Sequence, residues 1–216
     1  MNKTWIYNLD DYQSIFGLTA QELQKRILDF PSGISSVNAE LYAKGFYMVS
    51  ADPAYQLTPE EMRIHAYEML QTSIQQLEPD NNHFSLISKW RMSTEIFLSD
   101  YALGKKEGRY KVLNHPPFQP LENSFELLLC TDYLFTANSS SLPIQQMMEE
   151  LCNLAMEVRI FPLPNLQSAV ASELGPVMLA LQNRNFGVEV RGVAYPERKE
   201  ANAILRVWAK ECTISN

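Results

Sequence analysis

The sequence lacks the segments and residue clusters that mark several classes of protein. Its three cysteines, Cys130, Cys152 and Cys212, lie far apart without a CxxC pair, which disfavours both a disulfide framework and a cysteine zinc site. The first residues contain no apolar signal-peptide region, and no apolar run reaches the roughly 18 residues that a membrane helix needs. We therefore expect reduced thiols in a cytoplasmic protein that has no membrane partner.

Basic residues are also scarce, with 18 Lys and Arg against 25 Asp and Glu for a net charge of -7. Because nucleic acids attract clustered Lys and Arg, no nucleic-acid partner is expected. His65, His83 and His115 are widely spaced, so no metal site is expected either. Apolar residues make up 46% of the 216 positions, which is enough for one core, and residues 1–216 are expected to form a single domain.

Short apolar runs alternate with longer segments of helical periodicity, and this order predicts a parallel sheet with helices on both faces. The expected strands span residues 27–30, 46–52, 110–113, 125–130, 157–161, 187–194 and 203–209. The last two lie close enough in sequence to pair as an antiparallel hairpin at the sheet edge. The pattern therefore predicts an α/β fold with a mostly parallel, seven-stranded, Rossmann-like sheet.

Two helical regions stand outside this alternation. Thr58-Pro59-Glu60-Glu61 is a capping box that begins a helix to about residue 77, and a second helix follows from about 84 to 105. One crossover helix would connect the strands, so residues 58–107 are a candidate substrate cap. Residues 1–26 precede the first strand and are expected to form two short helices.

Candidate ligand-binding residues follow the first two expected strands. Asp29 leads into a turn at Gly33, where a helix begins and backbone N–H groups can meet a carboxylate or phosphate. Asp52 follows the second strand at the distance where an acid accepts hydrogen bonds from ribose hydroxyls. The pair predicts a nucleoside site, although a lone glycine turn is also common as a purely structural connection.

Four segments carry a family resemblance. Residues 27–40, 49–55, 125–130 and 157–163 look like the successive motifs of class I S-adenosylmethionine-dependent methyltransferases, and more narrowly like an uncharacterised bacterial subgroup. The similarity extends from about Asp10 to Val207. It implies the Rossmann-like class I methyltransferase fold, with S-adenosyl-L-methionine as cofactor and S-adenosyl-L-homocysteine (SAH) as product.

The resemblance also implies where the cofactor lies. Its methionine part would lie near Asp29, Pro31 and Gly33, its ribose on Asp52, and residues 1–26 would fold over it as a lid. The other implied contacts are Pro53, Asn114 and His115 beside the adenine, Cys130 and Thr131 beneath the sulfonium, and Tyr12 reaching down from the lid. Asn114 as a turn residue and Tyr12 as a core anchor are the structural alternatives.

The chain departs from the family pattern in two places. Pro31 and Ser35 replace the outer glycines of the acidic-x-Gly-x-Gly-x-Gly motif. After the fourth expected strand, residues 125–130, Asp132 stands where the subgroup has histidine. Asp132 is thus a candidate catalytic base, with a solvated strand-end acid as the alternative.

Two further side chains are candidates for contacting the substrate. Tyr133 lines a pocket or belongs to the core. Arg159 interrupts an apolar strand, so it either clamps an anionic substrate or forms a structural ion pair.

We expect methyl transfer to a small-molecule acceptor. The alternative is a noncatalytic protein that binds the cofactor or SAH as a sensor, which the missing glycines and Asp132 favour. A nicotinamide-dependent oxidoreductase is a third hypothesis, because Asp52 also suits a dinucleotide ribose, but the chain has no glycine-rich pyrophosphate turn. No oligomeric state is predicted.

Overall fold

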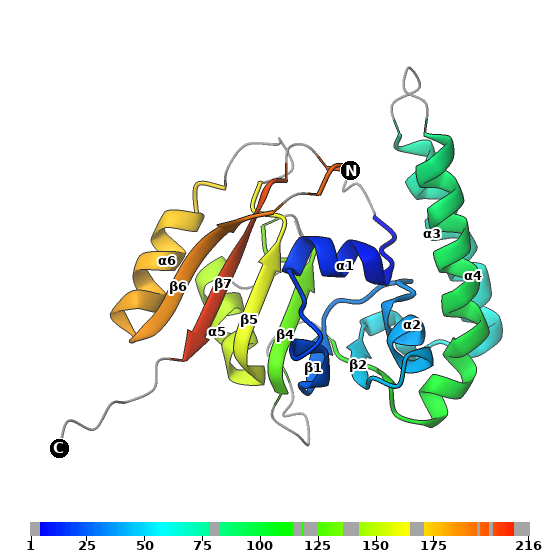
Figure 1. The fold of residues 1–216 in the computed structure, drawn as a ribbon, viewed down its shortest axis with the longest axis horizontal. Coiled ribbons are helices and arrows are strands. Elements are labelled where there is room, and N and C mark those ends of the chain that lie inside the picture. Colours follow the sequence, from blue (N-terminus) through cyan, green and yellow to red (C-terminus); the bar gives the residue numbers. More distant parts are fainter. Residues whose placement is uncertain are drawn as a thin grey trace.

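Seven strands form one mixed β-sheet in the computed structural model of the chain (Figure 1). The structure describes residues 5–77, 83–114, 118, 125–135, 143–164, 171–193, 195–198 and 201–209. The strands are β1 (Ile27–Asp29), β2 (Met48–Ala51), β3 (Tyr110–Lys111), β4 (Phe125–Thr131), β5 (Ala155–Phe161), β6 (Phe186–Gly192) and β7 (Ala203–Ala209). They lie in the order β3-β2-β1-β4-β5-β7-β6.

The pairing of these strands matches the predicted fold. β1 pairs in parallel with both β2 and β4, and the β2–β3 and β4–β5 pairs are also parallel. β7 runs antiparallel between β5 and β6. The predicted α/β fold, a mostly parallel, seven-stranded, Rossmann-like sheet with a C-terminal antiparallel hairpin, is thereby confirmed.

Helices cover both faces of the sheet (Figure 1). They are α1 (Leu9–Phe16), α2 (Val37–Ala43), α3 (Pro59–Gln75), α4 (Phe84–Lys106), α5 (Ile144–Leu154) and α6 (Leu174–Asn183), with 3-10 turns η1 (Glu22–Gln24) and η2 (Pro53–Gln56). Successive side chains of a strand point to opposite faces. Leu127 and Leu129 therefore pack with α1 and α2, while Leu128 and Cys130 pack with α5 and α6. None of the helices within the described ranges combines the length and apolarity that crossing a bilayer requires.

The observed bounds differ from the expected ones by a few residues. β2 is shorter than residues 46–52, and β6 ends at Gly192 rather than at 194. α6 begins at Leu174 and has Pro176 in its first turn. A proline is tolerated there because the N–H groups of a first helical turn have no intrahelical partner.

The long helices α3 and α4 form a pair beside the sheet. The expected capping box is present, since Thr58 and Glu61 each bond the other's backbone N–H. α4 contacts α2 and β3, so α4 is the crossover helix and α3 packs outside it. The pair rises past the ends of the strand arrows in Figure 1. Its role as a substrate cap stays a prediction.

The register of the C-terminal hairpin can be tested with two glycines of β6. Gly187 lies opposite Trp208, and a Cβ on Gly187 would come within 2.1 Å of the indole ring. Gly187→Ala should therefore lower the free energy of unfolding by about 1–3 kcal/mol. Gly192→Ala is the control, because its Cβ meets nothing closer than 3.9 Å, and it should change stability by about 0.5 kcal/mol at most. Equal denaturation midpoints for the two variants would contradict this register.

Candidate functional site

The candidate site lies where three neighbouring parallel strands end. β1 stands between β2 and β4, so Asp29, Asp52 and Thr131 follow or end adjacent strands at the same edge of the sheet. The chain leaves β1 toward β2 on one side and later returns to β4 on the other. Such a reversal of strand order opens a crevice at the carboxyl ends of the strands, where open α/β sheets bind ligands.

Asp29 is a fully buried acid at the centre of this edge. One carboxylate oxygen accepts a 2.8 Å hydrogen bond from the Tyr12 hydroxyl, which also lies 3.4 Å from Thr131 Oγ1. The other oxygen, Oδ2, is buried without a hydrogen-bond partner. Burial raises the pKa of Asp29 to about 7, although the Tyr12 bond favours the charged form.

The turn after β1 is built around Gly33. Its φ of +57° lies in the left-handed region that favours glycine, and a Cβ there would meet nothing within 4 Å. Its carbonyl accepts a 2.7 Å bond from the Tyr55 hydroxyl. Ser35, one of the two departures from the glycine motif, is buried, and its hydroxyl accepts from the Val37 N–H at the start of α2. Pro31 is half-buried in the same turn.

Asp52 joins β2 to this turn. Its Oδ2 accepts the Gly33 N–H at 3.0 Å, and its Oδ1 accepts the Ala54 N–H at 2.8 Å, which caps η2 with Pro53 at the first position. The N–H that the sequence offered to a ligand carboxylate is therefore bonded to Asp52. The Asp52 carboxylate thus ties the end of β2 both to the Gly33 turn and to η2.

Asp132 follows β4 with a left-handed φ of +49°, a conformation that aspartate adopts more readily than most residues. Its two oxygens accept a 2.5 Å bond from the Tyr7 hydroxyl and a 2.6 Å bond from Arg198. Arg198 also donates to the Tyr7 hydroxyl at 2.9 Å. Asp132 is therefore the anchor of a polar cluster, and a role as base would use the remaining acceptor capacity of its carboxylate.

Sequence reasoning missed the partners that close this cluster. The Arg198 guanidinium stands 4.9 Å from the Trp5 ring and 5.5 Å from the Phe161 ring. Lys89 of α4 adds a second link, with 2.7 Å to Asp11 of α1 and 3.1 Å to Glu197. No local motif marks these residues, because each pair joins distant parts of the chain.

Arg159 forms a structural ion pair, the alternative that the sequence left open. It donates to Glu157 at 2.7 Å, to the Phe16 carbonyl at 2.8 Å and to Glu22. Burial opposes ionisation of Glu22, but the hydrogen bond from Arg159 lowers its pKa to about 2. Arg159 thus fastens the residues around α1 and η1 to β5, and these contacts engage all three of its nitrogens.

The remaining candidates are spread over different environments. Cys130 is fully buried, and burial raises the pKa of its thiol. Tyr133 lies in the core on the α5 side, with its ring 5.3 Å from that of Phe30. Asn114 is exposed beyond the carboxyl end of β3, beside the strand that leads to Asp52. His115 lies outside the described residues.

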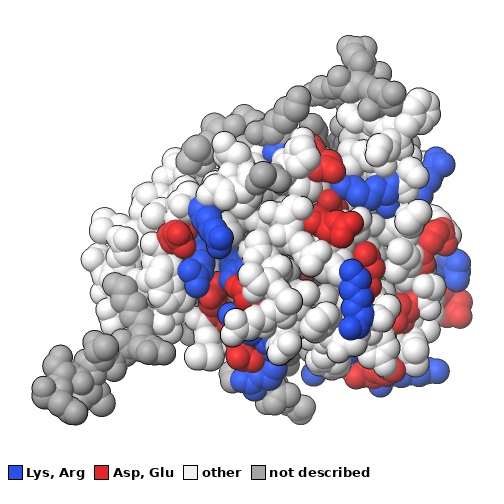
Figure 2. Space-filling view, viewed as in Figure 1, with Lys and Arg blue, Asp and Glu red and all other residues white. Residues whose placement is uncertain are grey.

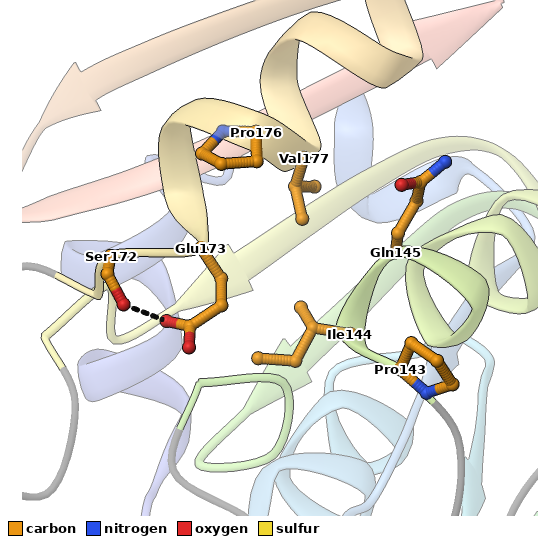
Figure 3. Close-up of a pocket in the computed structure, with 7 residues that line it drawn as sticks. All are labelled: Pro143, Ile144, Gln145, Ser172, Glu173, Pro176 and Val177. Carbon is orange, nitrogen blue, oxygen red and sulfur yellow. Dashed lines mark hydrogen bonds between the residues drawn. The ribbon is translucent and has the colours of Figure 1, made fainter.

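A separate pocket of about 400 Å³ opens between the first turns of α5 and α6 (Figure 3). Ile144 and Val177 line it from the two helices, and Glu173 lies at its rim with a hydrogen bond from Ser172. On the described part of the face in Figure 2, acidic and basic side chains lie beside one another. That part of the face shows no patch of a single sign.

Comparison with known families finds no match for this sequence. Among curated proteins, the chain is similar to the uncharacterised protein MJ0045 of Methanocaldococcus jannaschii, with 26% identity over 211 residues and 92% of each chain covered. That relative is archaeal, whereas the resemblance pointed to a bacterial subgroup.

Solved structures with a similar fold include two methyltransferases. The magnesium protoporphyrin IX methyltransferase of Synechocystis PCC 6803, crystallised with SAH, is 12% identical, with a TM-score of 0.48 over 88% of this chain and 77% of that one. A putative RNA methyltransferase of Pyrococcus horikoshii is 9% identical, with a TM-score of 0.42 over 88% and 78%. At such identities the likeness concerns the fold alone. The two proteins are also named for different methyl acceptors, a porphyrin and RNA.

The structural role of Arg159 predicts a large loss of stability when it is replaced. Arg159→Met would leave Glu22 and the Phe16 carbonyl without their buried donor, and we expect the free energy of unfolding to fall by about 3 kcal/mol or more. Arg184→Met is the control, because Arg184 pairs with Glu149 on the surface, and its loss should cost about 1 kcal/mol at most. Urea denaturation measures both, and similar midpoints would return Arg159 to the list of substrate-binding candidates.

Proposed function

We propose that this protein transfers a methyl group from S-adenosyl-L-methionine to a small-molecule acceptor at the carboxyl edge of the sheet. One observation carries the proposal: at the reversal of strand order, Asp29 holds a buried oxygen without a partner. An unpartnered buried carboxylate oxygen is costly, and a cationic group of a ligand would satisfy it. The ammonium of the cofactor's methionine part is such a group.

The surrounding residues fit the rest of this cofactor. Open space above Gly33 leaves room for a ligand against the turn. The Asp52 carboxylate would accept ribose hydroxyls, and Pro53 and Asn114 flank the position expected for adenine. Cys130 and Thr131 would pass beneath the sulfonium at the end of β4. When bound, the cofactor supplies an electrophilic methyl group, so the protein needs no nucleophile of its own.

The chain's own residues would supply positioning and a dry site. Tyr12, fully buried on α1, covers Asp29 and keeps water from it. Asp132 is the candidate group to hold the acceptor or accept its proton. Its two oxygens already accept from Tyr7 and Arg198, and a carboxylate can accept a further bond beside these. Proximity and alignment then carry most of the rate enhancement.

A noncatalytic sensor is the second candidate function, and two bonds favour it. Asp52 already satisfies the Gly33 N–H, and Arg198 already neutralises Asp132. A protein with these internal contacts would bind the cofactor or SAH and transfer nothing. The two functions differ in one measurable quantity, the consumption of S-adenosyl-L-methionine.

Calorimetric titration of ligand-free protein tests both functions at their shared step. We expect saturable binding of S-adenosyl-L-methionine and SAH, and none of NAD, because the chain has no glycine-rich pyrophosphate turn. Subsequent turnover with a panel of small acceptors supports the enzyme, and binding without turnover supports the sensor. If neither nucleoside binds, both functions are wrong.

Replacing Asp52 tests the ribose contact. Asp52→Asn keeps the size of the side chain and one acceptor oxygen but removes the charge. We expect affinity for SAH to fall by about 1–3 kcal/mol, the range for hydrogen bonds to charged groups. Asp10→Asn, an exposed acid in the first turn of α1, is the control and should bind as wild type does. Unchanged affinity in a folded Asp52→Asn variant would remove Asp52 from the site.

A further inference from the structure

Helix α1 is the element that closes over Asp29. The side chains of Leu9, Tyr12, Ile15 and Phe16 are all fully buried beneath it. The Tyr12 hydroxyl is the one hydrogen-bond donor that α1 gives to the Asp29 carboxylate. Water or a ligand therefore reaches Asp29 Oδ2 from this side only when α1 moves.

The surroundings of Asp29 favour its neutral form while α1 is in place. Within the described ranges no lysine or arginine pairs with it, and Oδ2 is buried without a hydrogen-bond partner. Burial raises its pKa more than the side-chain hydrogen bonds of Tyr12 and Ser32 lower it. The titratable and polar groups that face it from each neighbouring element are Tyr12 of α1, Ser32 of the turn, Asp52 after β2, Tyr55 of η2, and Cys130 and Thr131 of β4. Asp52 adds a like charge, so ionisation of Asp29 is opposed by both burial and repulsion.

We propose that Asp29 is a pH-sensitive latch for α1, which packs tightly over the protonated carboxyl and loosens when the carboxyl ionises. When α1 moves away, water reaches the Asp29 carboxylate and hydrates it, which cannot happen while α1 is in place. The latch is a property of the unliganded chain and goes beyond the proposed function. A protein of either candidate function would use it to admit ligand more readily at neutral than at acidic pH.

The direction and size of the effect follow from proton linkage. Asp29 has a pKa of about 7 in the closed site, against 3.8 for the ordinary side chain that water reaches. The open state therefore binds fewer protons, and the opening equilibrium rises with pH until about pH 7 and then levels. These pKa values give an increase of about tenfold between pH 6 and pH 8.

The other anchors of α1 supply a matched control. Arg159 and Lys89 hold its two ends, through the Phe16 carbonyl and the Asp11 carboxylate. Asp11 is a second buried carboxyl on α1 whose pKa burial raises, but Lys89 pairs with it at 2.7 Å. Asp11→Asn therefore removes a buried acid from the same helix and leaves Asp29 in place.

Hydrogen exchange of the α1 amides tests the latch. Protection factors, corrected for intrinsic exchange, should fall about tenfold from pH 6 to pH 8 in wild type and in Asp11→Asn. In Asp29→Asn they should stay constant over the same range. A constant protection factor in wild type, or an equal pH dependence in Asp29→Asn, would overturn the proposal.

A second measurement needs no variant and covers the case in which Asp29→Asn fails to fold. In protein labelled with ¹³C at aspartate carboxyls, the Asp29 resonance should titrate near pH 7, at the same midpoint as the loss of α1 protection. A midpoint below pH 5, or two separate midpoints, would overturn the latch. Neither experiment contains S-adenosyl-L-methionine, so failure of the proposed function would leave both readouts unchanged.

Discussion

The burial of one carboxyl group, that of Asp29, constrains everything around the carboxyl edge of the sheet. The acid ends a central strand, where both faces are covered, so its environment comes from elements that lie far away in sequence. Tyr12 donates a side-chain hydrogen bond to it, which requires α1 to lie across the end of β1. The fastening of α1, at one end by Arg159 and in its first turn by Lys89, holds that donor in place.

Three segments outside the parallel core meet above this edge through polar and charged groups. The N-terminal segment brings Tyr7, α4 brings Lys89, and the connection between β6 and β7 brings Arg198. Buried ion pairs add little net stability over apolar contacts, but removing one partner is expensive. These ion pairs and hydrogen bonds fix the positions of the N-terminal segment, α4 and the β6–β7 connection relative to one another. A site built from separate segments needs such fixed positions.

Much of the fold could be predicted from the sequence, because local patterns determine it. The apolar run of β4, the capping box at Thr58 and the paired terminal strands each express a rule about neighbours in sequence. The site was harder to predict. Asp132 was identified as a strand-end acid, but its bonds to Tyr7 and Arg198 span 125 and 66 positions and have no local signal. Tyr133 illustrates the same limit, since nothing near it in sequence distinguishes a core aromatic from a pocket-lining one.

The position of β7 between β5 and β6 bears on how the chain is made. β5 pairs with a strand that ends at Ala209, and Arg198 reaches back across 191 positions to Tyr7. On the ribosome, these contacts can form only after Arg198 and β7 have emerged. Until then the β5 edge has unpaired backbone groups, and pairing with another chain competes with folding. The contacts that close the carboxyl edge thus become available only after the parallel strands have been made, and a truncated product lacking β7 would have neither a finished sheet nor a covered site.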